Sequence, residues 1–443
     1  MTEERKGFNH FYDIYSREKI LPYLKHEAAA IPQWESCISC GLCLSRCPLL
    51  KGLDGCNYPG PAAVADRLSR SVTEYWSAAD VIFHCTTCMA CQEACPSGVP
   101  VMEAVLMIRA KIIEQARQAG KEISPFKERA FREILLKPGR LDKLARLGSL
   151  GQNLLLEGPV GSLLKHVLPP GMDCRPLFPP LAKKPLPKIL PEVLKSPGAR
   201  IRAGFFGGCL TNYSYTGLGQ AVARVLSING VEVVFPGDQQ CCGAPLVTFG
   251  DRGGARLLAG QNIVSFKRPG CDVIVTACAS CGLVLKLKYP TLFSESDEIY
   301  PDVLDFCGKV KDITEFLAEK ADLKEPRAKM PLRVTCHDPC HLNRGQGISG
   351  QPRSILKAIP GLDLVEMAEP GTCCGGAGLF SLEHTDWSQK ILSSKIRDIQ
   401  STGAGAVATS CPGCILQISG GVREAGAGQR VVHPVQLLAE AYE

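Results

Sequence analysis

Clustered cysteines constrain this chain more than any other feature of its sequence. The chain has 443 residues and 23 cysteines, and nine of these lie between residues 37 and 98. The first residues, MTEERKGFNHF, lack the apolar core of an export signal, and the cysteine count is odd, so a disulfide framework is not expected. In a reducing compartment such cysteines stay thiols and serve as metal ligands or reactive groups. We therefore expect a cytoplasmic, metal-binding protein.

The N-terminal cysteines form two copies of one motif, CxxCxxCxxxCP. This is the spacing of bacterial two-cluster ferredoxins, in which the last cysteine of each motif binds the other cluster. One cubane 4Fe–4S cluster is thus expected on Cys37, Cys40, Cys43 and Cys95, and a second on Cys85, Cys88, Cys91 and Cys47. Structural zinc is the alternative, because paired CxxC motifs also bind zinc.

Ten further cysteines form two sets of five with matching spacing. In each set, one cysteine and a final CxxC follow expected strands, and ligands in open α/β sheets bind beyond such strand ends. The glycine after each adjacent pair, Gly243 or Gly375, permits a tight turn. Five thiolates exceed the four that tetrahedral zinc takes, so zinc is the minor alternative. The first set is Cys209, Cys241, Cys242, Cys278 and Cys281, and the second is Cys340, Cys373, Cys374, Cys411 and Cys414.

The secondary-structure pattern changes along the chain. Apolar spacing predicts helices over residues 101–119 and 141–156, and residues 168–198 carry nine of the 32 prolines, as expected of an extended linker. After the linker, strands and helices alternate, and both this order and the cysteine spacing then repeat. Alternation of this kind favours parallel sheets with helices on both faces.

The predicted fold class is therefore α+β. A helical ferredoxin-type domain with two 4Fe–4S clusters is expected first, followed by two duplicated α/β domains with Rossmann-like parallel sheets. The expected divisions are a two-cluster domain over residues 1–120, a helical and proline-rich linker over 121–199, and the two repeated domains over 200–325 and 326–443.

Charge does not point to nucleic acid. The net charge is +6, and residues 101–200 hold 18 Lys and Arg against 9 Asp and Glu, but no nucleic-acid motif accompanies them. A solvated linker is the favoured interpretation of this basic stretch. Residues 135–168 are basic and apolar in turn, and a packed helical connector is favoured there over a helix lying on a membrane.

The later motifs resemble a known family. FFGGCLTN, FPGDQQCCGAP, TACASCG, CHDPCHL, TCCGGAG and ATSCPGC are similar to motifs of cysteine-rich CCG-domain iron–sulfur proteins. The iron–sulfur subunit of glycolate and lactate oxidases and the CCG-domain subunit of heterodisulfide reductase are of this kind. The resemblance implies a noncubane 4Fe–4S cluster on each five-cysteine set, and both sets are complete.

An electron-transfer role follows from these expectations. The stretch GLGQAV at residues 217–222 lacks the third glycine of a dinucleotide-binding turn, so a flavin is expected on a partner. By resemblance, that partner is an FAD-dependent 2-hydroxy-acid dehydrogenase in a hetero-oligomeric complex, and the acceptor is a quinone, a membrane cytochrome or another carrier. Such partners would hold the chain at the inner face of the cell membrane. The alternative is a catalytic subunit, similar to heterodisulfide reductase, that cleaves a disulfide at its noncubane clusters.

Several residues stand beside the predicted ligands. His337 and His341 flank Cys340 and are expected to donate hydrogen bonds or simply to pack, rather than to bind metal. Five cysteines lie outside all the motifs and are expected to be free and buried. They are Cys56, Cys174, Cys271, Cys307 and Cys336.

Overall fold

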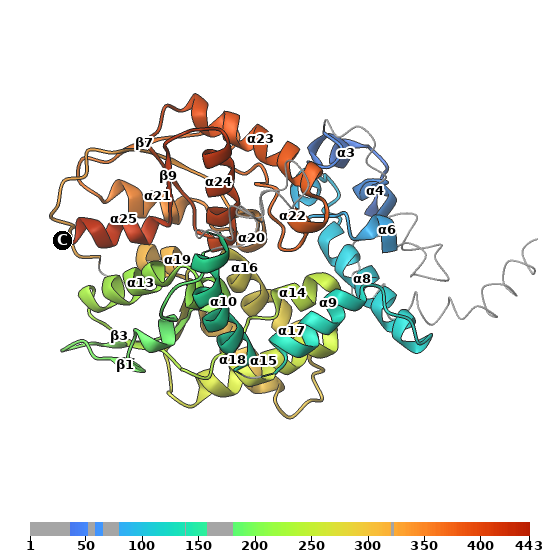
Figure 1. Cartoon of the computed structure of the whole chain (residues 1–443), viewed down its shortest axis with the longest axis horizontal. Helices are drawn as coiled ribbons and strands as arrows, with labels where there is room; N and C mark the ends of the chain where they lie inside the picture. Colours follow the sequence, from blue (N-terminus) through green and yellow to red (C-terminus); the bar gives the residue numbers. More distant parts are fainter. Residues whose placement is uncertain (1–35, 52–57, 65–78, 138, 157–179, 320–322) are drawn as a thin grey trace, which may run out of the picture. The chain divides into compact units, whose positions relative to one another are not determined.

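The computed structural model describes residues 36–51, 58–64, 79–137, 139–156, 180–319 and 323–443. Two compact units are present, and Figure 1 labels their elements. The N-terminal unit ends at Ile123 and includes Thr248–Gly250, and the C-terminal unit takes the rest of the chain. Within the described residues, every helix is too short or too polar to cross a membrane.

The N-terminal unit is helical. Its short helices carry the cysteine motifs, and its long helix confirms the prediction for residues 101–119. Val105, Ile108 and Ile112 of this helix are fully buried and form the apolar centre of the unit. The helices are α3 (Leu42–Arg46), α4 (Pro61–Ala63), α6 (Ala79–Ile82), α7 (Ala90–Glu93) and α8 (Val101–Gln118).

The segment between the motifs and the sheets is helical and then extended, as predicted. Its second half differs from a free linker, because β1 pairs antiparallel with β3 at the edge of the first sheet. An edge strand needs partners on one side only, so Pro191 and Pro197 can flank it. Residues 157–179 of the predicted linker lie outside the described residues. The elements are α9 (Pro125–Ala130), the π-helical turn η4 (Phe131–Leu135), α10 (Arg140–Leu156), η5 (Leu186–Lys188) and β1 (Val193–Leu194).

The first half of the sheet region confirms the predicted alternation of strands and helices. Apart from β1, its strands run parallel in the order β3-β2-β4-β5. The strands are β2 (Ile201–Phe206), β3 (Val231–Val234), β4 (Val273–Thr276) and β5 (Val310–Asp312). The helices are α12 (Gly208–Tyr213), α13 (Thr216–Ile228), α14 (Ala244–Phe249), α15 (Arg252–Lys267), α16 (Ala279–Leu283), η6 (Val284–Lys288), α17 (Tyr289–Leu292), α18 (Tyr300–Lys309) and α19 (Ile313–Glu319).

The second half repeats the first. Its four strands are all parallel and have the corresponding order, β7-β6-β8-β9. The strands are β6 (Arg333–Cys336), β7 (Asp363–Val365), β8 (Ala406–Ala408) and β9 (Arg430–Val432). The helices are α20 (Cys340–Gln346), α21 (Gly350–Lys357), α22 (Phe380–Glu383), α23 (Thr385–Ser401), α24 (Pro412–Glu424) and α25 (Pro434–Ala441).

The two halves share one hydrophobic core. Helix α13 of the first half packs on α25 of the second, and α19 packs on α21 in the reciprocal way (Figure 1). Buried side chains from both sheets, such as Phe205 and Val432, belong to the same apolar cluster. This reciprocal packing also brings α16, which contains Cys281, against α20, which begins at Cys340.

Candidate metal centres

The two N-terminal cysteine loops share an unusual backbone. Ser39 and Gly41, on either side of Cys40, have φ of 54° and 78°, and Thr87 and Met89, on either side of Cys88, have φ of 56° and 61°. Positive φ is costly for residues other than glycine, above all for a β-branched threonine, and such strain gathers at functional sites. The backbone therefore turns in the same way around Cys40 in one loop and around Cys88 in the other.

The thiols of these loops fall into two groups. Burial raises the pKa of Cys43, and its neighbouring thiols are Cys37, Cys40 and Cys95. Burial likewise raises the pKa of Cys47 to about 12, with Cys88 and Cys85 as its neighbours. Each group thus contains the last cysteine of the other motif.

Two further residues hold the second of these groups, and sequence reasoning missed both. Burial, together with a hydrogen bond to the Cys85 thiol, raises the pKa of Tyr58 well above its usual value. Arg109, buried on α8, donates a hydrogen bond of 2.6 Å to the carbonyl oxygen of Cys85. In the sequence, the signal for this contact was an arginine next to the apolar residues of α8.

The five cysteines of the first C-terminal set converge where their strands end. Cys209 lies on α12 after β2, Cys241 and Cys242 follow β3, and Cys278 and Cys281 follow β4. Side-chain hydrogen bonds connect neighbouring thiols in the order Cys209, Cys241, Cys242, Cys281 and Cys278.

The adjacent cysteines of this set depend on a turn at the following glycine. Gly243 has a φ of +83°, in agreement with the sequence argument. Hydrogen bonds from Cys241 and Cys281 lower the pKa of Cys242 to about 6. A thiolate is the form in which cysteine binds metal, so this position is electrostatically prepared for a cation.

The second set repeats this arrangement. Gly375 also has a φ of +83°, and an added Cβ would lie 2.7 Å from the backbone oxygen of Ser388. The sulfur atoms of Cys374 and Cys414 are 3.6 Å apart. Hydrogen bonds with Cys373 and Cys414 lower the pKa of Cys374 well below its usual value.

Two further cysteines complete the second set. Cys411 exchanges a side-chain hydrogen bond with Cys414, and Cys340 is the first residue of α20 and is partly exposed.

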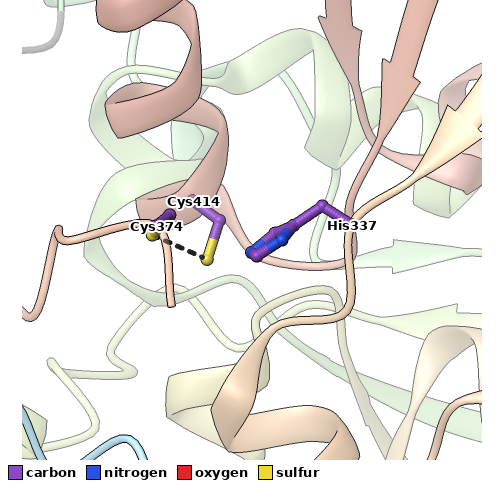
Figure 2. A group of neighbouring side chains, drawn as sticks. All are labelled: His337, Cys374 and Cys414. Atoms are coloured by element: carbon purple, nitrogen blue, oxygen red, sulfur yellow. Dashed lines mark hydrogen bonds between the residues drawn. The ribbon is translucent and has the colours of Figure 1, made fainter. Parts of the chain in front are cut away.

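His337 lies beside these sulfurs. It follows β6, is 1% exposed, and has no hydrogen-bond partner for either ring nitrogen among the described residues. Figure 2 shows its ring pointing toward Cys414, and the ligand atoms of His337, Cys374 and Cys414 all lie within 4.8 Å of one another.

The two C-terminal sets adjoin each other, which the sequence did not reveal. Cys278 of the first set and Cys411 of the second lie near enough for each to shift the pKa of the other. Ser280 lies between the halves, with its hydroxyl 3.9 Å from the Cys411 sulfur and 3.0 Å from Nδ1 of His341. His341 therefore takes part in a hydrogen bond, one of its two expected roles.

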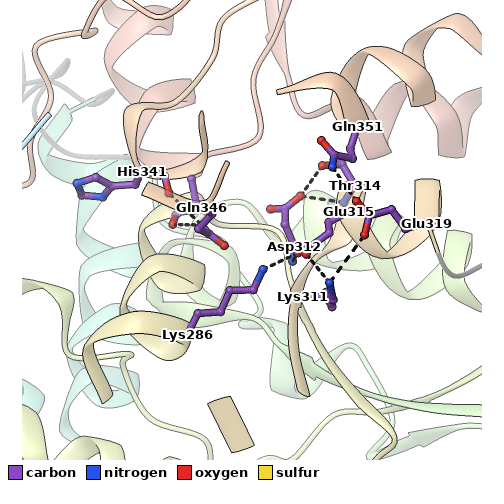
Figure 3. A network of polar contacts seen from close by, with 10 residues as sticks. Lys286, Lys311, Asp312, Thr314, Glu315, Glu319, His341, Gln346 and Gln351 are labelled. Carbon is purple, nitrogen blue, oxygen red and sulfur yellow. Dashed lines mark hydrogen bonds and ion pairs between the residues drawn. The ribbon is translucent and has the colours of Figure 1, made fainter. Parts of the chain in front are cut away.

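A polar network supports the end of β5 in the first half (Figure 3). Glu315 is 8% exposed and accepts hydrogen bonds of 2.6 Å from both Lys286 and Lys311. Burial alone would raise the pKa of Glu315, but these two bonds lower it below its usual value. The network joins η6, β5 and α19, all of which follow Cys281 in the sequence.

Replacing Glu315 with glutamine is expected to destabilise the protein. The change takes the carboxylate partner from the ammonium group of Lys286 and leaves Lys311 with Glu319 alone. We expect a cost of about 2–3 kcal/mol, and the melting temperature at pH 7 should fall by several degrees. Because the pKa of Glu315 is lowered on folding, its contribution is lost as the pH falls below about 4.5.

The melting temperatures of the wild type and of Glu315→Gln should therefore draw together as the pH falls below about 4.5 and through the lowered pKa of Glu315. Asp305→Asn is the control, since Asp305 pairs with Lys309 at the exposed surface. Equal melting temperatures for Glu315→Gln and Asp305→Asn at pH 7 would contradict this assignment.

The remaining cysteines fit their expected roles where they are described. Cys336 and Cys271 are buried free thiols, and burial raises the pKa of Cys336 to about 12. Cys307 is a half-buried free thiol, while Cys56 and Cys174 lie outside the described residues. Across the described part of the chain no two cysteines form a disulfide. Strained loops and convergent, partly ionised sulfurs fit soft metal groups rather than disulfides.

Comparisons with known proteins agree with this chemistry. A family described as a cysteine-rich domain matches residues 203–286 and again 334–419, and a 4Fe-4S dicluster domain matches residues 33–99. One subunit of the fumarate reductase (CoM/CoB) of Methanothermobacter marburgensis is 31% identical over 92% of this chain and 72% of the relative.

Two bacterial relatives are also similar. The probable glycolate oxidase iron-sulfur subunit of Bacillus subtilis is 31% identical over 92% of this chain and 93% of the relative. Lactate utilization protein A 2 of Bacillus cereus is 28% identical over 54% of this chain and 98% of the relative.

Proposed function

Because the chain belongs to the family of iron–sulfur proteins that join a 4Fe-4S dicluster domain to cysteine-rich CCG domains, we propose that it is the electron-transfer subunit of an oxidoreductase complex. It accepts electrons from an FAD-dependent dehydrogenase of a glycolate- or lactate-type 2-hydroxy acid. It passes them to a quinone, a cytochrome or another carrier. The names of the Bacillus relatives support this class of donor.

One observation carries the proposal: the thiols of the chain gather into separate groups, and two of these groups touch. The first and second C-terminal sets adjoin through Cys278, Ser280 and Cys411. Adjoining groups of soft ligands suit a relay, whereas a single isolated group would suit a structural metal. Iron–sulfur clusters supply one-electron uptake and release, and the chain supplies their thiolates, burial and spacing.

The proposed ligands follow the grouping of the thiols. We assign one cubane cluster to Cys37, Cys40, Cys43 and Cys95 and the other to Cys85, Cys88, Cys91 and Cys47. Cys95 raises the pKa of Cys43, and Cys88 raises the pKa of Cys47. Both effects support the exchange of one ligand between the two motifs. Each five-cysteine set is assigned a noncubane 4Fe–4S cluster, with zinc as the minor alternative.

The domain and cellular assignments are part of the same proposal. A two-cluster domain would end near residue 120, a linker would reach residue 199, and the repeated domains would divide near residue 325. A break between compact units at Ile123 supports the first of these divisions. The protein would act in the cytoplasm, held at the inner face of the membrane by its partners.

Each cubane cluster is proposed to take its fourth cysteine from the other N-terminal motif. Replacing that cysteine should therefore damage the cluster of the other motif. Cys95→Ala should damage the cluster of the distant Cys37 motif, and Cys47→Ala should damage the cluster of the Cys85 motif. Electron paramagnetic resonance (EPR) spectra of the two reduced variants should each lose a different one of the two cubane signals. The companion variants Cys43→Ala and Cys91→Ala identify which signal belongs to which motif.

Cys95→Ala should therefore resemble Cys43→Ala and not Cys91→Ala. A match of Cys95→Ala with Cys91→Ala would show that each motif binds its own cluster with four local cysteines.

The function is tested by electron transfer from a flavoprotein. The chain is purified without oxygen, mixed with a flavin-dependent hydroxy-acid dehydrogenase from its own complex, and supplied with glycolate or lactate. We expect substrate-dependent bleaching of the visible absorption of the clusters. If the native complex contains no flavoprotein and neither acid reduces the chain, the proposed donor is wrong.

A second function has one observation in its favour. The two complete, adjoining sets would let a disulfide bind at one or both clusters, and the Methanothermobacter relative is named as a CoM/CoB enzyme. In this case the chain itself would reduce the disulfide to two thiols with two electrons and two protons. Titrating the reduced protein with disulfides and finding its spectra unchanged would exclude this role.

A further inference from the structure

The imidazole of His337 is a buried polar group that makes no hydrogen bond of ordinary geometry within the described part of the chain, although the backbone of Pro370 lies near enough to influence its pKa. Its side chain is 1% exposed, and neither ring nitrogen has a hydrogen-bond partner among the described residues. Burying a polar ring in this way is costly unless something satisfies it. The backbone holds the residue in place, because its N–H donates 2.9 Å to the carbonyl oxygen of Ala408 on β8.

The surroundings of the ring indicate what would satisfy it. One ring nitrogen and the sulfurs of Cys374 and Cys414 lie within 4.8 Å of one another, and the two sulfurs are 3.6 Å apart (Figure 2). With metal–sulfur bonds of about 2.3 Å and metal–nitrogen bonds of about 2.1 Å, two sulfurs on one tetrahedral metal ion are separated by about 3.7 Å. The two sulfurs are therefore spaced as ligands of a shared metal ion, and the imidazole of His337 lies beside them.

The duplication provides an internal comparison. His337 lies three residues before Cys340, and the residue three before Cys209 in the first half is Phe206. Phe206 is fully buried and packs on Phe266, with ring centroids 5.8 Å apart. The same place in the fold thus presents an apolar ring to the first set and an imidazole to the second.

We propose that His337 is a nitrogen ligand of the metal group held by the second set, alongside Cys374 and Cys414. The neutral imidazole donates a lone pair from one ring nitrogen, and the first set has no counterpart because Phe206 cannot bind metal. An imidazole nitrogen added to the five thiolates would make the duplicated halves chemically unequal.

This inference rests on the proposed function, since it needs an iron–sulfur group on the second set. The full-length protein is purified without oxygen, reduced with dithionite, and studied by pulsed EPR. We expect a strong hyperfine coupling from a directly bound ¹⁴N nucleus. The coupling should persist in His341→Gln and disappear in His337→Phe, which gives the second set the residue of the first.

Labelling the wild-type chain with ¹⁵N-histidine needs no variant and should convert the same coupling into that of ¹⁵N. A paramagnetic signal with only weak nitrogen coupling, or with coupling that survives His337→Phe, would overturn the assignment and leave the electron-transfer proposal standing. Protein without any cluster signal would overturn both.

Discussion

Removing iron from the protein is expected to unfold the cysteine loops of the N-terminal unit while the parallel sheets persist. Helix α3 buries no residue and α7 buries only Ala90, so these two short cysteine-bearing helices add little to the apolar core. Structures of this kind depend on bound metal for most of their folding free energy. The sheets, in contrast, are joined by an extended apolar core drawn from both halves.

Limited trypsin digestion measures this difference. After chelation in the presence of oxygen, cleavage at Arg46 and Lys51 should accelerate by at least about a hundredfold, which corresponds to about 3 kcal/mol of lost local stability. Lys395 on α23 is fully buried and should stay protected, which makes it the internal control. Unchanged cleavage at Arg46 in iron-free protein would contradict a metal-dependent fold for these loops.

Cys374→Ser is expected to abolish the metal group of the second C-terminal set. Cys374 lies 3.6 Å from Cys414, and hydrogen bonds with its neighbours favour its thiolate. A serine hydroxyl is a harder and far less acidic donor, so it would not replace a thiolate on iron. About four of about sixteen iron atoms should be lost, together with the corresponding EPR signal.

Cys336→Ser is the matched control for this variant. Cys336 belongs to the same half, is equally buried and ends the neighbouring strand, but it lies outside the five-cysteine set. Its replacement should leave the iron content unchanged. Equal iron loss in the two variants would mean that general destabilisation, rather than a missing ligand, explains the result.

Strands and cysteine motifs were predictable because they rest on local patterns. The apolar runs of β2, β4 and β6 and the regular spacing of α8 carry their own signal, and the repeated motifs revealed the duplication. Strand β1 could not be predicted, because two residues among prolines show no periodicity and pair only when β3 is in place.

The contacts around the metal centres depended on the tertiary fold. Tyr58 reaches Cys85 from a distant part of the sequence, and Ser280 meets Cys411 only because the two halves pack reciprocally. The position of His337 depended on the tertiary fold for the same reason. Its spacing from Cys340 suggested a neighbour of the site, whereas its position facing Cys374 and Cys414 depends on β6 and α24 being folded.

The central claim is that thiolates of this chain hold iron–sulfur clusters that carry single electrons. The most direct test is metal analysis combined with EPR of protein purified without oxygen. We predict about sixteen iron atoms per chain, a brown colour and paramagnetic signals after reduction with dithionite. Colourless protein that contains zinc in place of iron and gives no signal after dithionite would contradict this account.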